Sequence, residues 1–283
     1  MLQNSVISQG QVVLSLNYEY EFLAETQFGM DPIPNINKEQ TWLNSGSLFA
    51  SYGVTEGLSI AAVVPFRNIT NDKYLFPGQH EDQYEGGKYT RHSAGMGDIV
   101  LLVNFVPNIL LKLPGTVITV GIKLATGSVH AVDQYGTRFS DLLQLGTGSY
   151  DPVFSISSTQ SWNNLSVTGS FFTRFTMQEN PYGYKYGDEF QTVLGTDYQH
   201  SSRFFGGVSL NHVFTTRDTF GYGKVARKRG GKWFYMAPRF GFNLKDNLSL
   251  EARIPIPLYQ NVNESQLVSD YQIQFGTSYH FDL

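Results

Sequence analysis

Residues 270–283 read Asp270-Tyr-Gln-Ile-Gln-Phe-Gly-Thr-Ser-Tyr-His-Phe-Asp-Leu283. Side chains alternate across a β-strand, so one face of this stretch is polar and the other carries Tyr271, Ile273, Phe275, Tyr279 and Phe281. A soluble sheet would bury the aromatic face in a core, whereas a transmembrane barrel turns it towards lipid and keeps the polar face for its lumen. One strand alone leaves both options open.

The composition favours an aromatic, glycine-rich β protein. The 283 residues could form one large all-β unit or two ordinary domains. Aromatic residues make up 14% of the chain and glycine occurs 28 times. Charged residues reach only 16%, below the quarter that is usual in soluble domains. The net charge of −4 gives no reason to expect nucleic acid as a partner.

Several protein classes are excluded. The chain has no cysteine, so it has neither a disulfide framework nor a thiolate metal site. It has no run of 18 apolar residues, which excludes a helical membrane protein. The first residues lack the basic and apolar regions of a secretory signal, and we expect residues 1–10 to form a short periplasmic segment.

Alternation of apolar and polar side chains predicts twelve strands. They cover residues 11–22, 41–54, 58–69, 95–106, 116–126, 152–161, 165–177, 189–199, 204–215, 232–243, 248–259 and 270–281. Connections after the odd-numbered strands are generally long, and those after the even-numbered strands are short, as at Asn163-Asn164. A soluble sandwich has no reason to sort its loops by length in this way.

This sorting of loops is typical of outer-membrane barrels, which have short periplasmic turns and long extracellular loops. Trp42, Trp162 and Trp233 also fall at predicted strand ends, where aromatic girdles meet the membrane interface. The sequence therefore predicts an all-β fold, a single transmembrane antiparallel up-and-down barrel of twelve strands over residues 1–283. Its expected location is the bacterial outer membrane, with outer-membrane lipid as a partner. A soluble β protein is the alternative.

Charged residues in strand interiors fall on the polar face, which a barrel turns into its lumen. They are Glu19, Glu21, Lys123, Arg174, Asp197, Arg239, Glu251 and Arg253. The three glutamates lie on strands that closure brings together, whereas Lys123 and Arg174 belong to the far side. We expect opposed rows of charge to create a transverse field that favours polar or zwitterionic solutes.

Two loops carry clustered charges. Lys224, Arg227, Lys228, Arg229 and Lys232 fall in an extracellular loop by parity. This basic patch could bind lipopolysaccharide phosphates or steer anionic solutes, or it could be a solvated loop. The acidic residues Asp72, Glu81, Asp82 and Glu85 could bind Ca²⁺, although their spacing matches no defined calcium loop.

The loop before residue 152 contains two notable segments. Gly146-Thr-Gly-Ser149 resembles a phosphate-cradling loop, but it lacks the lysine and the helix of a nucleotide site. We interpret these glycines as bending the chain into the next strand. Residues 139–145 are unusually apolar for an outside loop, and we expect them to fold into the mouth of the barrel and narrow the pore.

The histidines favour neither a metal site nor an enzyme. They stand at positions 80, 92, 130, 200, 212 and 280, without the pair spacing of metal ligands. A hydrolase site could be sought at Asn211-His212, or at His200 with Ser201 and Ser202. The second group lies in a predicted periplasmic turn, and His212 has lipid-facing parity. We therefore predict no catalytic residues, no metal and no cofactor.

Glycine-led motifs carry a resemblance to a known family. The motifs are Gly95-Met-Gly-Asp-Ile-Val-Leu101, Thr126-Gly-Ser128, Leu145-Gly-Thr-Gly-Ser-Tyr-Asp-Pro152 and Pro257-Leu-Tyr-Gln-Asn-Val-Asn263 with Gln266-Leu267. With the terminal strand, they resemble the MetA-pathway of phenol degradation family of outer-membrane transporters. The end of the chain also resembles the targeting signal of outer-membrane barrels, through Gln274, Gly276, Tyr279 and Phe281. These resemblances imply a barrel and transport of small molecules.

The sequence thus predicts an outer-membrane channel for passive passage of small solutes through a narrow, charge-lined lumen. One alternative is a transporter of hydrophobic compounds with lateral exit through a seam, for which Pro238 in the middle of a strand is the sequence hint. Another is a barrel without a transport role, such as a structural anchor or, less expected, a lipid-modifying enzyme.

Overall fold

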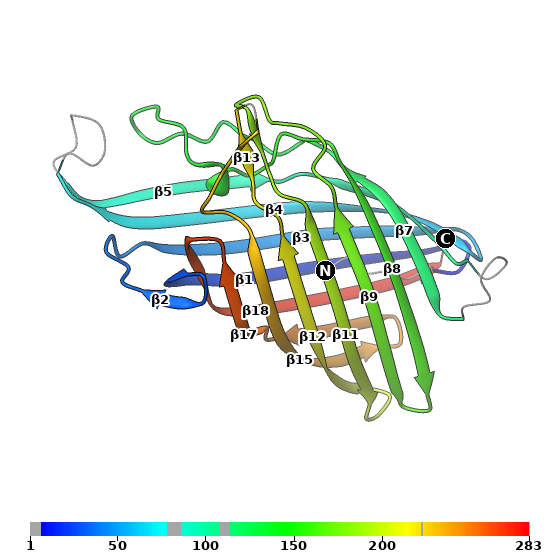
Figure 1. Ribbon diagram of the computed structural model, residues 1–283. Coiled ribbons are helices and arrows are strands. Elements are labelled where there is room, and N and C mark those ends of the chain that lie inside the picture. Colours follow the sequence, from blue (N-terminus) through cyan, green and yellow to red (C-terminus); the bar gives the residue numbers. More distant parts are fainter. Residues whose placement is uncertain (1–6, 78–85, 108–113, 222, 283) are drawn as a thin grey trace.

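The computed structural model describes residues 7–77, 86–107, 114–221 and 223–282 (Figure 1). Its main sheet forms twelve wall positions, two of which consist of two shorter strands in sequence. In chain order the wall contains β1 (Gln11–Phe28), β3 (Gln40–Thr55), β4 (Leu58–Leu75), β5 (Gly87–Met96) followed by β6 (Val100–Phe105), β7 (Thr116–Lys123), β8 (Asp151–Trp162), β9 (Leu165–Arg174), β11 (Glu189–Gln199), β12 (Phe204–Thr215), β15 (Gly231–Lys245), β16 (Leu248–Arg253) followed by β17 (Ile256–Val262), and β18 (Ser265–Asp282).

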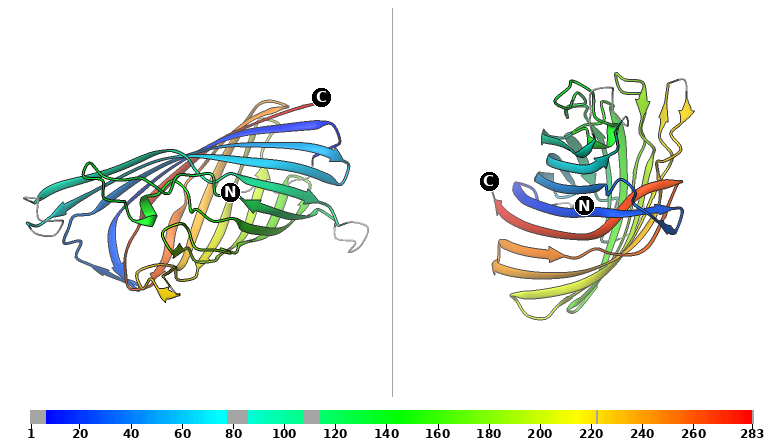
Figure 2. Two further views of the ribbon diagram at one scale, coloured as in Figure 1. Left: turned by 90° about the horizontal axis from the view of Figure 1, so that it is seen from above. Right: turned by 90° about the vertical axis from the view of Figure 1, so that its left-hand side faces the viewer.

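The sheet closes on itself between the two ends of the chain. β1 pairs antiparallel with β18 from Gln11↔Asp282 to Phe28↔Ser265, and these two strands run side by side in Figures 1 and 2. β12 pairs with β15 over its whole length, which completes the circle. Closure removes the unpaired strand edges that a bilayer does not tolerate.

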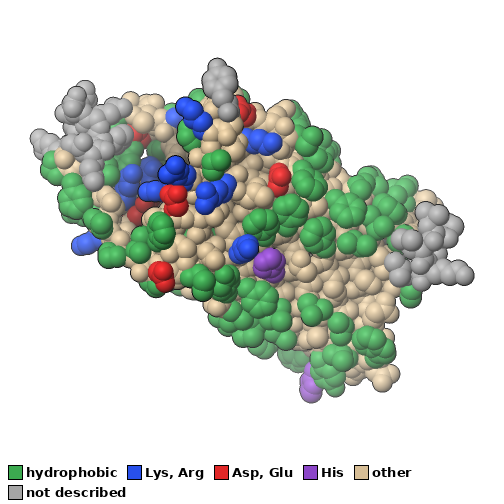
Figure 3. Space-filling view, in the orientation of Figure 1, with side chains coloured by type: hydrophobic (Ala, Val, Ile, Leu, Met, Phe, Trp, Pro, Cys, Tyr) green, Lys and Arg blue, Asp and Glu red, His purple; other side chains and the backbone are tan. Residues whose placement is uncertain are grey.

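The outer surface of the wall is apolar. Leu16 on β1 is 59% exposed and Ile60 on β4 is 49% exposed, although both are large hydrophobic residues. Such residues spread over the wall in Figure 3, whereas charged side chains gather around the loops at its upper left. The rings of Phe22, Trp42 and Tyr271 pack together at the outer end of this apolar surface. The centroids of Trp42 and Tyr271 lie 5.5 Å and 5.4 Å from that of Phe22. The closed sheet and its apolar outer surface confirm the integral outer-membrane barrel predicted from the sequence.

No helix in the described ranges is long and apolar enough to cross a membrane.

The strands at one end reach further than the sequence predicts. β4 continues to Leu75 and β5 begins at Gly87, so most of the expected loop between residues 69 and 95 is a long hairpin. The prediction of a loop over residues 260–269, before the last strand, is also wrong, because only Asn263 and Glu264 separate β17 from β18. Polar residues on both faces of these outer segments hide the alternation, since the strands have left the bilayer there.

The other connections follow the predicted pattern. Tight turns join β3 to β4, β8 to β9 and β15 to β16, and Asn163 adopts the positive φ of 51° expected for the Asn-Asn turn. The long connections are residues 124–150, 175–188 and 216–230. A small sheet of β10 (Tyr184–Lys185), β13 (Thr219–Phe220) and β14 (Lys224–Val225) links two of them. Another short strand, β2 (Asp31–Ile33), pairs with the outer end of β1.

Two wall positions are interrupted. Between β5 and β6 the ladder breaks at residues 97–99, and β5 pairs with β4 alone. Between β16 and β17 it breaks at residues 254 and 255, opposite Pro238 of β15. β17 pairs with β15 on one side. On its other side it shares no ladder with β18, although every residue of both strands is described.

The N-terminal segment enters from the end where β1 begins. Ile7 is buried and the backbone N–H of Gly10 donates to the carbonyl of Gly53 at 2.9 Å. Residues 1–6 of the predicted periplasmic segment lie outside the described residues.

Candidate functional site

A belt of inward-facing residues lines the barrel at one level of the hydrogen-bonding register. Each strand from β9 round to β5 contributes one residue, and neighbouring members are direct register partners. Because barrel strands are tilted against the axis, the row winds obliquely around the lumen. In order, the belt contains Ser166, Asp197, Gly207, Arg239, Arg253, Gln274, Glu19, Ser45, Arg67 and Gly95.

Four charges of this region form one network. Arg239 lies between two carboxylates, with Nη2 2.6 Å from Oδ1 of Asp197 and Nη1 3.3 Å from Oε2 of Glu251. The other oxygen of Glu251 is 3.5 Å from Nη2 of Arg253. The Arg239 guanidinium also lies over the ring of Phe205, 5.2 Å from its centroid. Two cations and two anions therefore balance on this wall, and β12 supplies an aromatic surface beside them.

The two glutamates of β1 are held by the last strand. Gln274 Nε2 donates to Glu19 at 2.6 Å and Gln272 Nε2 donates to Glu21 at 2.6 Å. Both glutamines belong to the polar face that the terminal sequence predicts. β18 separates β1 from β16, so Glu19 and Glu251 are not on adjacent strands, and Glu19 faces the lumen apart from the arginine network.

Lys123 and Arg174, predicted to line the far side of the lumen, are instead enclosed by carboxylates. Lys123 Nζ is 2.8 Å from Asp151 Oδ2 and 3.1 Å from Asp98 Oδ2, and its side chain is only 8% exposed. Arg174 contacts Asp151 at 3.4 Å and Glu189 at 3.1 Å. The two cations meet three carboxylates, so they form no positive row. The expected opposed rows of charge are therefore absent, because buried cations require local anionic partners.

The Gly146-Thr-Gly-Ser149 segment binds the carboxylate of Asp98, an anion of the same chain. Thr147 N–H donates to Asp98 at 2.7 Å, and Gly127 N–H donates to the other oxygen of Asp98 at 2.9 Å. A Cβ on Gly127 would lie 2.6 Å from the Cα of Gly146, so two glycines allow the backbones to touch. The N–H groups of Gly127 and Thr147 are taken by Asp98, whereas that of Gly146 donates to the carbonyl of Ser128. These bonds fasten the loop before β8 to the wall.

Residues 124–150 fold into the barrel, as the apolar segment 139–145 predicts. Phe139 and Leu143 form a buried cluster with Ile69, which has the same inward parity on β4 as Arg67. Ser93 of β5 donates its hydroxyl to the carbonyl of Leu143 at 2.7 Å. A short 3-10 helix, η1 (Asp141–Leu143), forms at this point. The loop thus covers the inner face of β4 and β5.

Two of the three long loops, residues 124–150 and 175–188, are joined through Asp141. Its carboxylate accepts from Arg138 at 2.8 Å and from Asn180 at 3.0 Å, and its carbonyl accepts from Tyr186 at 2.7 Å. Arg138 also lies over the ring of Tyr182 at 3.9 Å. These contacts tie the inward loop to residues 175–188, which continue into the small outer sheet.

The predicted basic patch is smaller than expected. Arg229 is not free, because its Nε donates to the buried carboxylate of Asp218 at 2.8 Å. The hydroxyl of Tyr184 donates to the same oxygen, and burial together with this bond raises the pKa of Tyr184 above its ordinary value of 10.0. Lys232 has its ammonium 5.8 Å from the Phe214 ring centroid. The remaining members, Lys224, Arg227 and Lys228, are exposed in the same loop.

Inward positions are not uniformly polar, in contrast to the prediction. Phe49, Ala61, Leu102 and Val153 come from four different strands and form a buried cluster inside the barrel, with Phe172 packed against it. Beside it Asn104 donates to Ser59 at 3.2 Å and accepts from Thr119 at 2.7 Å. The lumen on the side of β4 to β9 is therefore filled by close packing.

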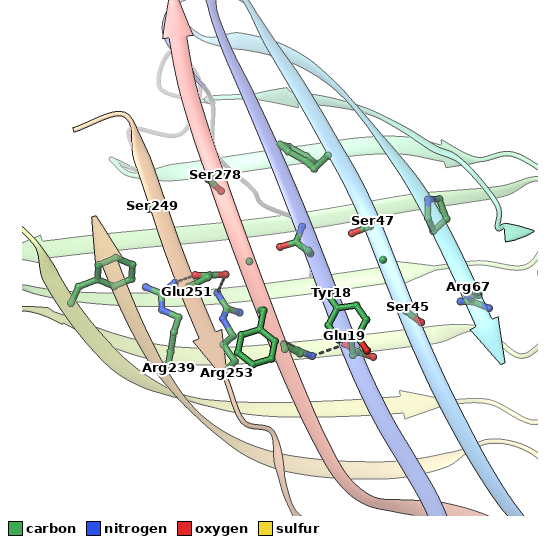
Figure 4. A pocket seen from close by; sticks show the side chains of 18 of the residues that line it. Tyr18, Glu19, Ser45, Ser47, Arg67, Arg239, Ser249, Glu251, Arg253 and Ser278 are labelled. Carbon is green, nitrogen blue, oxygen red and sulfur yellow. Dashed lines mark hydrogen bonds and ion pairs between the residues drawn. The ribbon is translucent and has the colours of Figure 1, made fainter. Parts of the chain in front are cut away.

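Open space remains on the opposite side. A cavity of about 490 Å³ lies against β1, β3, β4, β12, β15, β16 and β18. Figure 4 shows Glu251, Arg239 and Arg253 along one flank and Ser45 and Arg67 along the other, with Glu19 between them. His280 lines this cavity and also a second hollow at the periplasmic mouth, beside Asp246 and Asn247.

Arg67 is the one charged residue of the cavity lining that the predicted set does not contain. It is exposed, it lines the cavity, and no ion pair of its guanidinium occurs within the described ranges. Its inward parity could have been read from the alternation of Ile60 to Phe66 on β4, because Arg67 follows directly. Asp98, Asp151 and Glu189 were missed because they lie at predicted strand starts or loop ends, where parity is ambiguous.

The structure assembles no hydrolase or metal site from the proposed residues. His212 points outward from β12 between Thr192 and Phe234 of the neighbouring strands, and His200 lies in an exposed turn. No group of three potential metal ligands occurs in the described part of the chain. Asp72 lies within β4 and pairs with Lys88 at 2.7 Å, while Glu81, Asp82 and Glu85 lie outside the described residues.

Among solved structures, the COG4313 outer membrane channel from Pseudomonas putida F1 is similar over 98% of both chains, with a TM-score of 0.73 and 12% sequence identity. The two chains share a fold. The CymD monoaromatic hydrocarbon channel has a TM-score of 0.49 at 11% identity, covering 98% of this chain and 89% of CymD. The P. putida toluene transporter TodX has a TM-score of 0.49 at 9% identity, covering 98% and 91%.

No family model and no curated protein sequence matches the chain. Membership of the MetA-pathway family therefore stays a prediction.

Proposed function

We propose that this protein is an outer-membrane channel through which small solutes pass passively, along a narrow lumen lined with charges. The observation that carries the proposal is the cavity of about 490 Å³ inside a closed barrel, bounded by Arg67, Glu19 and the arginine network. Its size is in the range of small-molecule sites. The shared fold with an outer membrane channel supports the same reading.

The packing supports a narrow path. The cluster around Phe49 and Leu102 fills one side of the lumen, and the inward loop around Phe139 and Leu143 covers the outer part of β4. A twelve-stranded barrel has much less internal room than a general porin. We infer that passage is confined to the side of β1, β18, β16 and β15.

The test is single-channel conductance of the purified protein in planar bilayers, with salt gradients to measure the reversal potential. Arg239→Gln removes a cation that faces the cavity between Asp197 and Glu251, so the reversal potential should move towards cations. Arg174→Gln should move it less, because its carboxylate partners Asp151 and Glu189 do not line the cavity. Arg203→Gln, in an exposed turn, is the matched control. An unchanged potential in Arg239→Gln would refute charge selection at this wall.

A second candidate function is transport of hydrophobic compounds with lateral exit. It is favoured by the seam between β17 and β18, which share no ladder and lie beside Pro238. Across the seam, Gln260 Nε2 donates to the Ser269 carbonyl at 3.1 Å. Ile256 on β17 and Tyr271 on β18 are exposed, so the outer surface on both sides of the seam is apolar.

A disulfide across the seam separates the two candidates. Gln260→Cys with Ser269→Cys should block uptake of an apolar solute under oxidising conditions while ion conductance persists, if exit is lateral. Equal uptake in the oxidised and reduced forms would exclude the seam as the exit. A correctly folded barrel that neither conducts ions nor transfers apolar solutes would point to a structural role.

A further inference from the structure

Arg67 differs from the other arginines of the cavity. Arg239 has two carboxylate partners and Arg253 has one. Arg67 is exposed and has no carboxylate within ion-pair distance in the described part of the chain. A guanidinium facing a partly enclosed cavity without a counter-ion is favourably placed to receive an anionic group of a solute.

The surroundings of Arg67 add hydrogen-bond donors and apolar surface. Ser45 is its direct register partner on β3, and Ser47 pairs with Pro65 one inward position further along. All four residues line the cavity, and Figure 4 shows Ser45 and Ser47 on the strand beside Arg67. The two hydroxyls can donate to a second anionic oxygen, and Pro65 offers an apolar surface below it.

The nearest negative charge in the belt is displaced from this corner. Glu19 is two strands away from Arg67, with Ser45 between them. Strands lie about 4.8 Å apart, so the two backbones are separated by about 10 Å. Glu19 also accepts a hydrogen bond from Gln274 on its other side, which holds it towards β18. An anionic group can therefore meet Arg67 without lying against Glu19.

We propose that this corner of the cavity binds the carboxylate of a small organic acid, with Arg67 forming a two-point contact and Ser45 and Ser47 donating to it. A planar guanidinium matches a carboxylate in this way, and the cavity of about 490 Å³ leaves room for a ring or short chain. The inference rests on the proposed function, because it names the class of solute that the lumen recognises.

The test is titration calorimetry of the folded protein in detergent with benzoate, and with benzamide as its neutral counterpart. We expect Arg67→Gln to weaken benzoate binding at least tenfold, while benzamide binding stays within twofold of the original. Arg67→Lys should recover part of the benzoate affinity, because it keeps the charge and loses the two-point geometry. The matched control is Arg203→Gln in the exposed turn, which should bind benzoate as the unaltered protein does.

Equal benzoate affinity in the unaltered protein and Arg67→Gln would overturn the proposal, and so would an equal loss of benzoate and benzamide. Failure of the unaltered protein to bind benzoate would also overturn it. Conductance in potassium chloride, measured on the same samples, separates the two levels. A conducting barrel without Arg67-dependent benzoate binding refutes the acid site and leaves the channel, whereas a silent barrel that binds benzoate through Arg67 refutes the channel and leaves the site.

Discussion

Replacing Lys123 by methionine should destabilise the barrel strongly. The substitution keeps a long side chain and removes the charge that two carboxylates share. Lys123 Nζ is 2.8 Å from Asp151 and 3.1 Å from Asp98, and it also donates to the carbonyl of Ser149 at 3.0 Å. The carboxylate side chains are 0% and 6% exposed, so water cannot take the place of the lost ammonium.

The magnitude follows from this burial. Removing one partner of a buried ion pair costs about 3–5 kcal/mol, because it leaves an uncompensated charge. Asp151 retains Arg174 at 3.4 Å, whereas Lys123 is the cation that Asp98 contacts in the described residues. Asp98 should therefore carry most of the cost. Lys123→Met with Asp98→Asn should recover more stability than Lys123→Met with Asp151→Asn.

Urea unfolding in detergent micelles, followed by the mobility difference of folded and unfolded barrel on gels, measures the effect. With a slope of about 2 kcal/mol per M, the midpoint should fall by about 2 M. Lys228→Met is the matched control, because Lys228 is exposed in a loop and should change stability by less than about 0.5 kcal/mol. A midpoint for Lys123→Met equal to that of the control would refute the assignment of Lys123 to a buried ionic cluster.

Two further predictions concern the loops. Burial and the hydrogen bond to Asp218 raise the pKa of Tyr184 above 10.0. The loop contact therefore stabilises fully below pH 10 and loses this stability as pH rises further. Proteolysis within the loops 175–188 and 216–230 should increase above pH 10, and Tyr184→Phe should reduce that pH dependence. Gly127→Val should detach the inward loop, residues 124–150, because the new Cβ would lie 2.6 Å from the Gly146 Cα. Single-channel currents should become larger and noisier. Unchanged currents would count against a pore narrowed by this loop.

The fold could be predicted where the strands cross the membrane. There the bilayer and the lumen impose opposite chemistry on alternate residues, so Leu14, Leu16 and Tyr18 identify the outer face of β1 without any structure. Beyond the bilayer both faces meet water and the alternation disappears. The sequence therefore predicts loops at the outer ends of β4, β5 and β17, although their backbones continue in ladders.

For the site, the sequence predicts which side chains point inward, but it does not predict which ion pairs they form. Parity predicts that Arg239, Glu251 and Arg253 face the lumen, and in the structure all three line the cavity. Ion pairs depend on register between strands that are distant in sequence, and on loops that fold inward. Lys123 illustrates the limit, because parity predicts its direction alone, while its partner Asp98 comes from the break between β5 and β6.

The enclosure of Lys123 and Arg174 changes the electrostatics of the whole lumen. Had both cations faced water, a solute would have met positive charge on the side of β7 and β9 and negative charge near β1. Asp98, Asp151 and Glu189 neutralise that side locally, and the buried cluster around Leu102 excludes solutes from it. In the channel that we propose, the charges that a solute can meet are those of the open side, where Arg67 alone lacks a carboxylate among the described cavity arginines. Selection by this lumen should therefore depend more on one arginine of β4 than on the larger number of charges that the sequence places inside the barrel.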